Sequence, residues 1–171
     1  MDTVVLIFPR SRDPVGKDIA TLLASMYEAW GKKRGYCAEI FSNEWEDKAN
    51  ALSVIFWGEN LVDTLKGESG LHKVVRSSPH DSLGRRYTSF SLVVVRESGE
   101  VPQLDTAEGF KQIMEWKDRF SSQSEMWGGS IRTYILDGMP LLHDLGTGYK
   151  DKDPLGFLEG NLNRVLDARV F

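Results

Sequence analysis

The order of apolar runs constrains the fold of this chain more than any single motif does. Thr3–Phe8 is a short β-branched run followed by Pro9, which is typical of a buried strand. In the next stretch apolar side chains recur every three or four residues, as on one face of a helix: Ile19, Leu22, Leu23, Met26, Tyr27 and Trp30. Asp13 and Pro14 stand where an N-cap and a first helical residue belong, so we expect a helix from there to about residues 32–35.

The rest of the chain alternates strand-like and helical stretches. Five stretches have the composition of strands: 36–41, 51–57, 71–76, 87–95 and 131–136. The polar residues 42–50 and residues 121–129 are expected to be connections. Helices are expected at 61–66, after a cap at Asp105, and from Asp153 and Pro154 onward. This order predicts an α/β (α+β) fold, a mixed sheet with helices packed on it.

Composition limits the class of protein. The 171 residues are 41% hydrophobic, enough for one sizeable core and one compact unit. A net charge of -4 and a pI near 5.4 argue against indiscriminate coating of nucleic acid, which needs many cations. Cys37 is the single cysteine, so we expect no internal disulfide or thiolate metal site, and a small buried hydrophobe there. No apolar run approaches a membrane span and the N-terminus lacks a signal-peptide pattern, so a soluble, cytoplasmic monomer is expected.

Residues 67–90 are locally basic in a chain that is acidic as a whole. They carry four cations between two strand-like runs: Lys73, Arg76, Arg85 and Arg86. In the sequence the only nearby acidic residues are Asp81 in the loop and Glu68 at its edge. The pattern indicates that a phosphate-rich partner such as RNA binds at this part of the chain. The alternative, which stays open, is an ordinary solvated hairpin face.

Other candidate sites are weaker. Ser78 and Pro79 form a dipeptide common in turns. His72 and His80 have no second set of ligands in the sequence, so no metal or cofactor is expected. His143 precedes Asp144, but no serine or thiol stands where it would complete a nucleophilic arrangement. We therefore expect no catalytic residue.

Three blocks of the sequence occur together in the order found in one known family. They are GKDIATLLASMYEAWGKKRGY, SSPHDSLGRRYTSF and a C-terminal block that begins WGGSIRTYILDGMPLL. Together they resemble bacterial class I peptide-chain release factors of the type that reads UGA and UAA. The resemblance implies the release-factor decoding superdomain, built from two segments at about 1–96 and 127–171.

The family also has a domain with a GGQ tripeptide that promotes hydrolysis of peptidyl-tRNA. No GGQ occurs in this sequence, and only about 31 residues separate Val95 from Trp127. That length is enough for a loop and a helix. The family's N-terminal helical domain is likewise expected to be missing. The resemblance therefore implies a decoding lobe without the catalytic domain, and no enzymatic activity.

The family's codon-reading tripeptide SPF corresponds to Ser78, Pro79 and His80, so the serine that bonds the second codon base is kept. Tyr87 stands in place of the histidine that stacks on the codon, and a flat ring can still stack. Thr88 is unchanged. Further expected RNA contacts are Arg85, Arg86 and Trp127, of which Trp127 matches the switch-loop tryptophan.

The resemblance breaks at the helix tip. Where the family has GGTE to meet the first uridine, this chain has Asp13, Pro14 and Val15. Proline removes a backbone donor and valine removes a carboxylate. This departure puts strict readout of uridine in question.

Three functions remain open. The first is binding to the decoding centre of the small ribosomal subunit, or to RNA of similar shape, which modulates termination or rescue by occupancy without hydrolysis. The second is an RNA-binding module that acts off the ribosome on a transcript. The third is an adaptor for a protein partner that supplies activity in trans, with Trp45 and Trp57 as contacts if they are exposed. No membrane partner is expected.

Overall fold

The computed structural model describes residues 1–10, 14–45, 49–77, 82–103, 106–126 and 130–169. Its strands are β1 Thr3–Pro9, β2 Cys37–Trp45, β3 Ala49–Trp57, β4 Gly70–Ser77, β5 Arg86–Glu97, β6 Arg132–Ile135, β7 Leu141–Asp144 and β8 Lys150–Asp151. Its α-helices are α1 Pro14–Lys33, α2 Val62–Leu65, α3 Ala107–Met126, α4 Pro154–Leu158 and α5 Asn163–Leu166. Short 3-10 helices lie at η1 Lys66–Glu68, η2 Ser98–Glu100 and η3 Asp167–Arg169.

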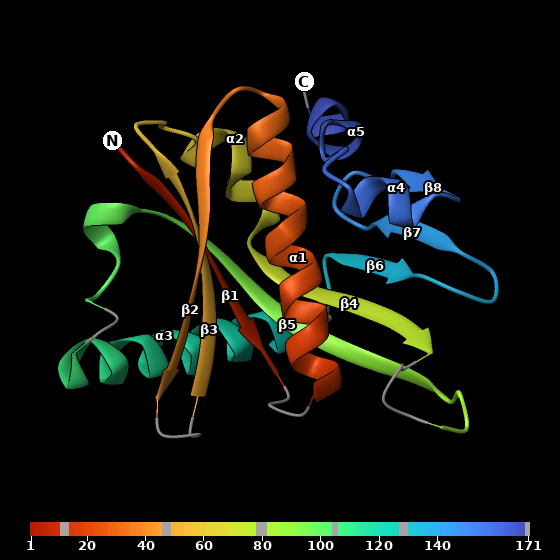
Figure 1. The fold of residues 1–171 in the computed structure, drawn as a ribbon, viewed down its shortest axis with the longest axis horizontal. Coiled ribbons are helices and arrows are strands. Elements are labelled where there is room, and N and C mark those ends of the chain that lie inside the picture. Colours follow the sequence, from red (N-terminus) through yellow and green to blue (C-terminus); the bar gives the residue numbers. More distant parts are fainter. Residues whose placement is uncertain (11–13, 46–48, 78–81, 104–105, 127–129, 170–171) are drawn as a thin grey trace.

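The strands form one mixed sheet in the order β2-β3-β1-β5-β4-β6-β7-β8. Among the described pairings β4 and β6 run parallel and the other neighbours run antiparallel. Figure 1 shows α1 lying across one face of the sheet and α3 along the other. The expected α/β fold, a mixed sheet with helices packed on it, is confirmed.

The central strand β1 explains why the chain starts with an uninterrupted apolar run. Val5 and Ile7 pack with α1 on one face, whereas Val4 and Leu6 pack with Ile113 of α3 on the other. A strand that is buried on both faces favours apolar side chains along its length, and its one polar side chain, Thr3, donates its hydroxyl to the Glu59 carbonyl at 2.7 Å. The two helices therefore give the sheet two cores.

Most of the expected elements are confirmed. β1, α1, the hairpin strands β4 and β5, and β6 lie where the patterns predict them. The helix expected at Asp153 and Pro154 is also present, and the Asp153 side chain accepts a hydrogen bond from the Gly156 backbone N–H. These elements have strong local patterns, which explains why the sequence alone locates them.

Two expected connections are in part regular structure. Ser42–Trp45 extends β2 and pairs with β3 as far as Trp45↔Ala49, and α3 continues to Met126 through most of the expected loop at 121–129. β7 and β8 were not expected at all. β2, β7 and β8 gain their backbone partners from neighbouring strands, whereas the end of α3 continues the helix that precedes it.

Cys37 was expected to be a buried hydrophobe, and that prediction is wrong. It is exposed at the start of the edge strand β2, while its neighbour Ala38 is buried in the core beside α1. Successive strand residues point to opposite faces. Cys37 therefore points away from the helix that covers this part of the sheet.

A buried ion pair joins the early part of the chain to its C-terminal part. Arg132 of β6 donates to both carboxylate oxygens of Glu68, at 2.7 and 2.6 Å, and its Nε donates to Asp144 of β7 at 3.0 Å. All three side chains are essentially inaccessible to solvent. Arg169 adds a second guanidinium 2.7 Å from Glu68. We call these four residues the buried charge cluster.

Aromatic and imidazole groups complete the hydrogen bonding of this cluster. The Tyr27 hydroxyl of α1 donates to Glu68 at 2.9 Å. His72 lies 2.8 Å from the Glu68 carbonyl oxygen and 2.9 Å from the Tyr134 hydroxyl. Because a carbonyl can only accept, His72 Nε2 carries the proton, and Nδ1 accepts from Tyr134. His72 is thus held in its neutral form.

The same contacts shift the pKa values of the two acid-sensitive groups. Burial and the charge of Arg132 lower the pKa of the His72 imidazole to about 4. Burial by itself would raise the pKa of Glu68, but the charge and hydrogen bonds of Arg132 outweigh it and lower that pKa to about 2. Each group therefore binds its proton more weakly in the folded chain than in the unfolded one.

We expect acid to destabilise the fold in two steps. The unfolded chain protonates His72 near pH 6.5 and the folded chain only near pH 4, so the free energy of unfolding falls as pH drops through this window. The loss is on the order of 3 kcal/mol. Glu68 adds a further loss below pH 4.5. Urea unfolding at a series of pH values measures both. His72→Gln should abolish the fall in the free energy of unfolding between about pH 6.5 and 4, whereas the control His143→Gln should keep it. If His72→Gln showed the same slope of unfolding free energy against pH in this window as the unsubstituted protein, the assignment to His72 would be wrong.

Arg132→Met should destabilise the protein strongly, because it leaves Glu68 and Asp144 buried without their main counter-charge. The expected loss is about 3–5 kcal/mol in urea unfolding. Arg164→Met is the matched control, since Arg164 pairs with Asp151 at a site where its side chain is 33% exposed. That control should lose less than about 1 kcal/mol. Equal losses of unfolding free energy in the two variants would show that the buried charge cluster does not stabilise the fold more than an exposed ion pair does.

Candidate nucleic-acid interface

The candidate interface is the end of the β4–β5 hairpin. Its ladder runs to the pair Ser77↔Arg86, with Arg76↔Tyr87 and Val75↔Thr88 before it. Residues directly opposite each other share a face, and neighbours along a strand alternate. Arg76 and Tyr87 therefore lie on the face toward α1, whereas Arg86 and Thr88 lie on the face toward α3.

Several of the predicted contacts cannot be placed. Ser78, Pro79, His80 and Trp127 lie outside the described residues. Of the other predicted contacts, Arg85, Arg86 and Thr88 are exposed and Tyr87 is half-buried. These four are brought together at the hairpin end, but they divide between its two faces.

The C-terminal segment joins the hairpin from the side. The Ile131 N–H donates to the Leu71 carbonyl at 2.8 Å, and the Leu136 N–H donates to the Val75 carbonyl at 2.9 Å. β6 thus enters the sheet beside the start of β4 and runs parallel to it toward Ser77. Ser130 and Ser77, the described residues that flank the Trp127 and Ser78 segments, consequently lie toward opposite ends of β4.

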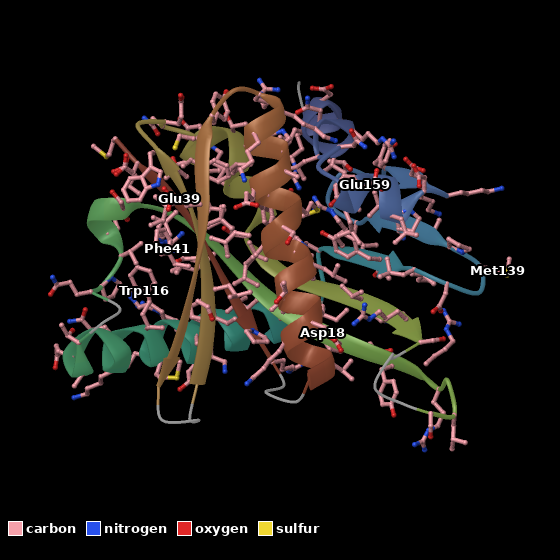
Figure 2. The ribbon with its side chains drawn as sticks, in the orientation of Figure 1. Asp18, Glu39, Phe41, Trp116, Met139 and Glu159 are labelled. Carbon is pink, nitrogen blue, oxygen red and sulfur yellow. The ribbon has the colours of Figure 1, made fainter. Side chains whose placement is uncertain are left out.

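The counter-charges of the basic hairpin differ from those expected. Arg76 Nη2 lies 3.3 Å from Asp18 Oδ2 of α1, and Arg86 pairs with Asp137, which follows β6. Figure 2 shows Asp18 near the first turn of α1. Glu68, expected at the edge of the loop, is instead buried with Arg132. The ion partners of the hairpin therefore come from sequence positions about 50–60 residues away.

Asp137 makes the most detailed contact with the hairpin end. Its Oδ2 accepts from the Ser77 backbone N–H at 2.7 Å, and its carbonyl accepts from Arg86 Nη2 at 3.1 Å. The Asp137 carboxylate and Arg86 Nε lie 3.4 Å apart, an ion pair without hydrogen-bond geometry. The hydrogen bond from Ser77, with the charges of Arg86 and Arg76, lowers the pKa of Asp137.

An aromatic and cationic surface lies on the α3-facing side of the hairpin. The Arg10 guanidinium stands 5.3 Å from the centre of the Phe90 ring, and the Arg10 N–H donates to the Phe90 carbonyl at 2.9 Å. Lys73 is opposite Phe90 across the ladder, and Thr88 follows on the same face. Phe90 is the ring on this side, and it is half-buried against the core. A flat ring beside cations is a combination that single-stranded RNA can use, because its bases stack and its phosphates need positive charge.

Sequence reasoning missed Arg10, Asp18 and Asp137. The first two flank the start of α1 and the third follows a predicted strand. The sequence therefore offered one clue to these residues, namely that each lies near the end of a predicted helix or strand. Among the described residues no group of three or more His, Cys, Asp or Glu side chains is arranged so that it could hold a metal ion. Nor does any helix in the described ranges have the length and apolar character needed to cross a membrane.

This chain is similar to known proteins. Residues 16–93, which cover α1 from its third residue and most of the β4–β5 hairpin, match the model of the PCRF domain. Peptide chain release factor 2 of Campylobacter hominis is 41% identical over 106 residues, covering 61% of this chain and 28% of the relative. This chain is homologous to bacterial peptide chain release factor 2. The corresponding protein of Roseobacter denitrificans is 28% identical over 219 positions, covering 90% of this chain and 59% of the relative.

A solved structure shares the fold. RF2 of Thermus thermophilus superposes with a TM-score of 0.73 over 98% of this chain and 66% of that chain, at 21% identity. The chain spans between 28 and 59% of the length of the two release factor 2 relatives named above. Type-specific reading of UGA and UAA is not tested by these likenesses and stays a prediction.

Proposed function

We propose that this protein binds the decoding centre of the small ribosomal subunit, or RNA of similar shape, and modulates translation termination or rescue by occupancy. The observation that carries the proposal is the hairpin end. It holds Arg85, Arg86, Tyr87 and Thr88 together in a segment whose sequence and fold resemble release factor 2. A cation there, such as Arg85, would meet phosphate, and Tyr87 would stack on an unpaired base.

We further propose that the protein does not hydrolyse peptidyl-tRNA. No Gly-Gly-Gln occurs among its 171 residues. The alignment with the Roseobacter relative is 219 positions long, more than the whole chain, so that relative has internal residues with no counterpart here. Between β5 and β6 this chain has η2 and α3, and α3 packs on the sheet. The two segments at about 1–96 and 127–171 would then act as one decoding unit.

The second candidate is an RNA-binding module that acts off the ribosome. Its support is the start of α1, where Pro14 is the first helical residue and offers no N–H to a base. The third candidate, an adaptor for a protein partner, has support in Trp57, whose side chain is 41% exposed on β3. The side chain of Trp45 lies outside the description.

Sedimentation with ribosomes tests the first candidate against the other two. Ribosomes carrying a stop or a sense codon in the A site should bring the protein into the pellet. Arg85→Ala should weaken this binding about tenfold and reduce its salt dependence, because one phosphate contact is lost. Lys152→Ala, a cation removed near β8 and far from the hairpin, should change neither.

Absence of the unsubstituted protein from pellets of ribosomes and of small subunits would overturn the first candidate. Binding to single-stranded RNA alone would then favour the second. If Arg85→Ala and Lys152→Ala behaved alike, the hairpin would be an ordinary solvated face.

A peptide-release assay tests the proposed lack of hydrolysis. Ribosomes with a formyl-methionyl ester in the P site should release no formyl-methionine above background when this protein is added, with any codon in the A site. An intact release factor 2 is the positive control. If this protein binds the same site, it should slow release by that factor in proportion to occupancy. Measurable release by this protein alone would contradict the proposal.

A further inference from the structure

Asp137 holds both ends of the hairpin loop at once. Ser77 is the last residue of β4 and Arg86 the first residue of β5, and these two form the terminal pair of the ladder. Asp137 accepts from the backbone of Ser77 with its side chain and from the side chain of Arg86 with its own carbonyl. One residue thus bridges the point where the chain leaves the sheet and the point where it returns.

The bridge is anchored in the C-terminal segment. Asp137 follows β6, and the Leu136 N–H is bonded to the Val75 carbonyl at 2.9 Å, which extends the β4–β6 pairing up to the bridge. Gly138 follows with φ of 78°, a left-handed conformation that favours glycine and turns the chain toward Met139. Figure 2 shows Met139 at the outer end of this turn.

We propose that Asp137 is a positioning residue for RNA binding, one that holds Ser77 and Arg86 in place at the end of the hairpin ladder, and that Arg86 serves this bridge instead of meeting phosphate. This inference rests on the proposed function of the hairpin. Arg86 is engaged by Asp137 through both its charge and a hydrogen bond.

Removal of the Asp137 carboxylate changes RNA affinity in opposite directions if the residue positions the hairpin and if it acts only through its charge. A carboxylate beside an RNA-binding loop repels phosphate, so its removal should tighten binding if charge were its only effect. If Asp137 positions the hairpin end, its removal should weaken binding even though a negative charge is lost. The two explanations thus predict opposite changes.

The experiment measures ribosome binding by sedimentation for Asp137→Asn, Asp137→Ala and the control Asp167→Asn. Asp167 is an exposed aspartate in η3, so its substitution makes the same change of charge. We expect roughly tenfold weaker binding for Asp137→Asn, the typical effect of losing one charge-assisted hydrogen bond, and a larger loss for Asp137→Ala. Asp167→Asn should bind as the unsubstituted protein does. Equal or tighter binding by both Asp137 variants would overturn the inference.

A double substitution tests the assignment of Arg86. Asp137→Ala removes the ion pair with Arg86 but keeps the carbonyl that accepts from it. If Arg86 acts through the bridge, Arg86→Ala combined with Asp137→Ala should therefore weaken binding by less than the product of the two single effects. If Arg86 meets phosphate independently, the two losses should multiply, which would overturn this part of the inference.

NMR gives a readout that does not depend on the ribosome. The Ser77 amide should resonate downfield because it donates to a carboxylate, and its shift should follow the titration of Asp137. Asp137→Ala should remove both effects, and Asp167→Asn should leave them. A Ser77 amide indifferent to Asp137→Ala would overturn the bridge itself. If the unsubstituted protein bound no ribosome while these shifts held, the proposed function would fail and the positioning of the hairpin end would stand.

Discussion

The contact of Arg132 with Glu68 is the interaction on which the rest of the structure depends. It brings a guanidinium from β6 onto a carboxylate from the turn that leads into β4, with both groups out of water. An isolated charge in such a place is costly, so burial of either group is tolerated only when its partner is present. The energy of this arrangement ties the C-terminal segment to the sheet in one register.

That register decides what the hairpin can do. Because β6 lies parallel to β4, the residue after it arrives beside Ser77 at the hairpin end, where Asp137 bridges the loop. Arg132 and Asp137 are linked by the other three residues of β6 and by Leu136, whose N–H continues the pairing with β4. A buried charge cluster and an exposed candidate RNA surface are thus placed by the same short element.

Local patterns allowed prediction of much of the fold and part of the site. β1, α1 and the basic hairpin each have a clear apolar pattern or clear turn residues. Neighbouring residues are therefore enough to identify them as strand, helix or hairpin. The ends of β2 and β3, the last turns of α3, and β7 lack such patterns. The strand segments are regular because pairing with neighbouring strands satisfies their backbone, and the last turns of α3 continue the hydrogen bonding of the helix before them. The pairing of Arg76 with Asp18 was unpredictable for the same reason.

The sequence by itself determined the class of fold, the two long helices and the concentration of cations near residues 73–86, because these depend on neighbours within a few residues. Only the tertiary structure decided which charges are buried, which cations are engaged by carboxylates and which strand face each predicted contact occupies. Those properties arise from contacts such as Arg132 with Glu68, 64 residues apart in sequence. No local period encodes a partner at that separation, since the free energy of the contact exists only once the sheet has assembled.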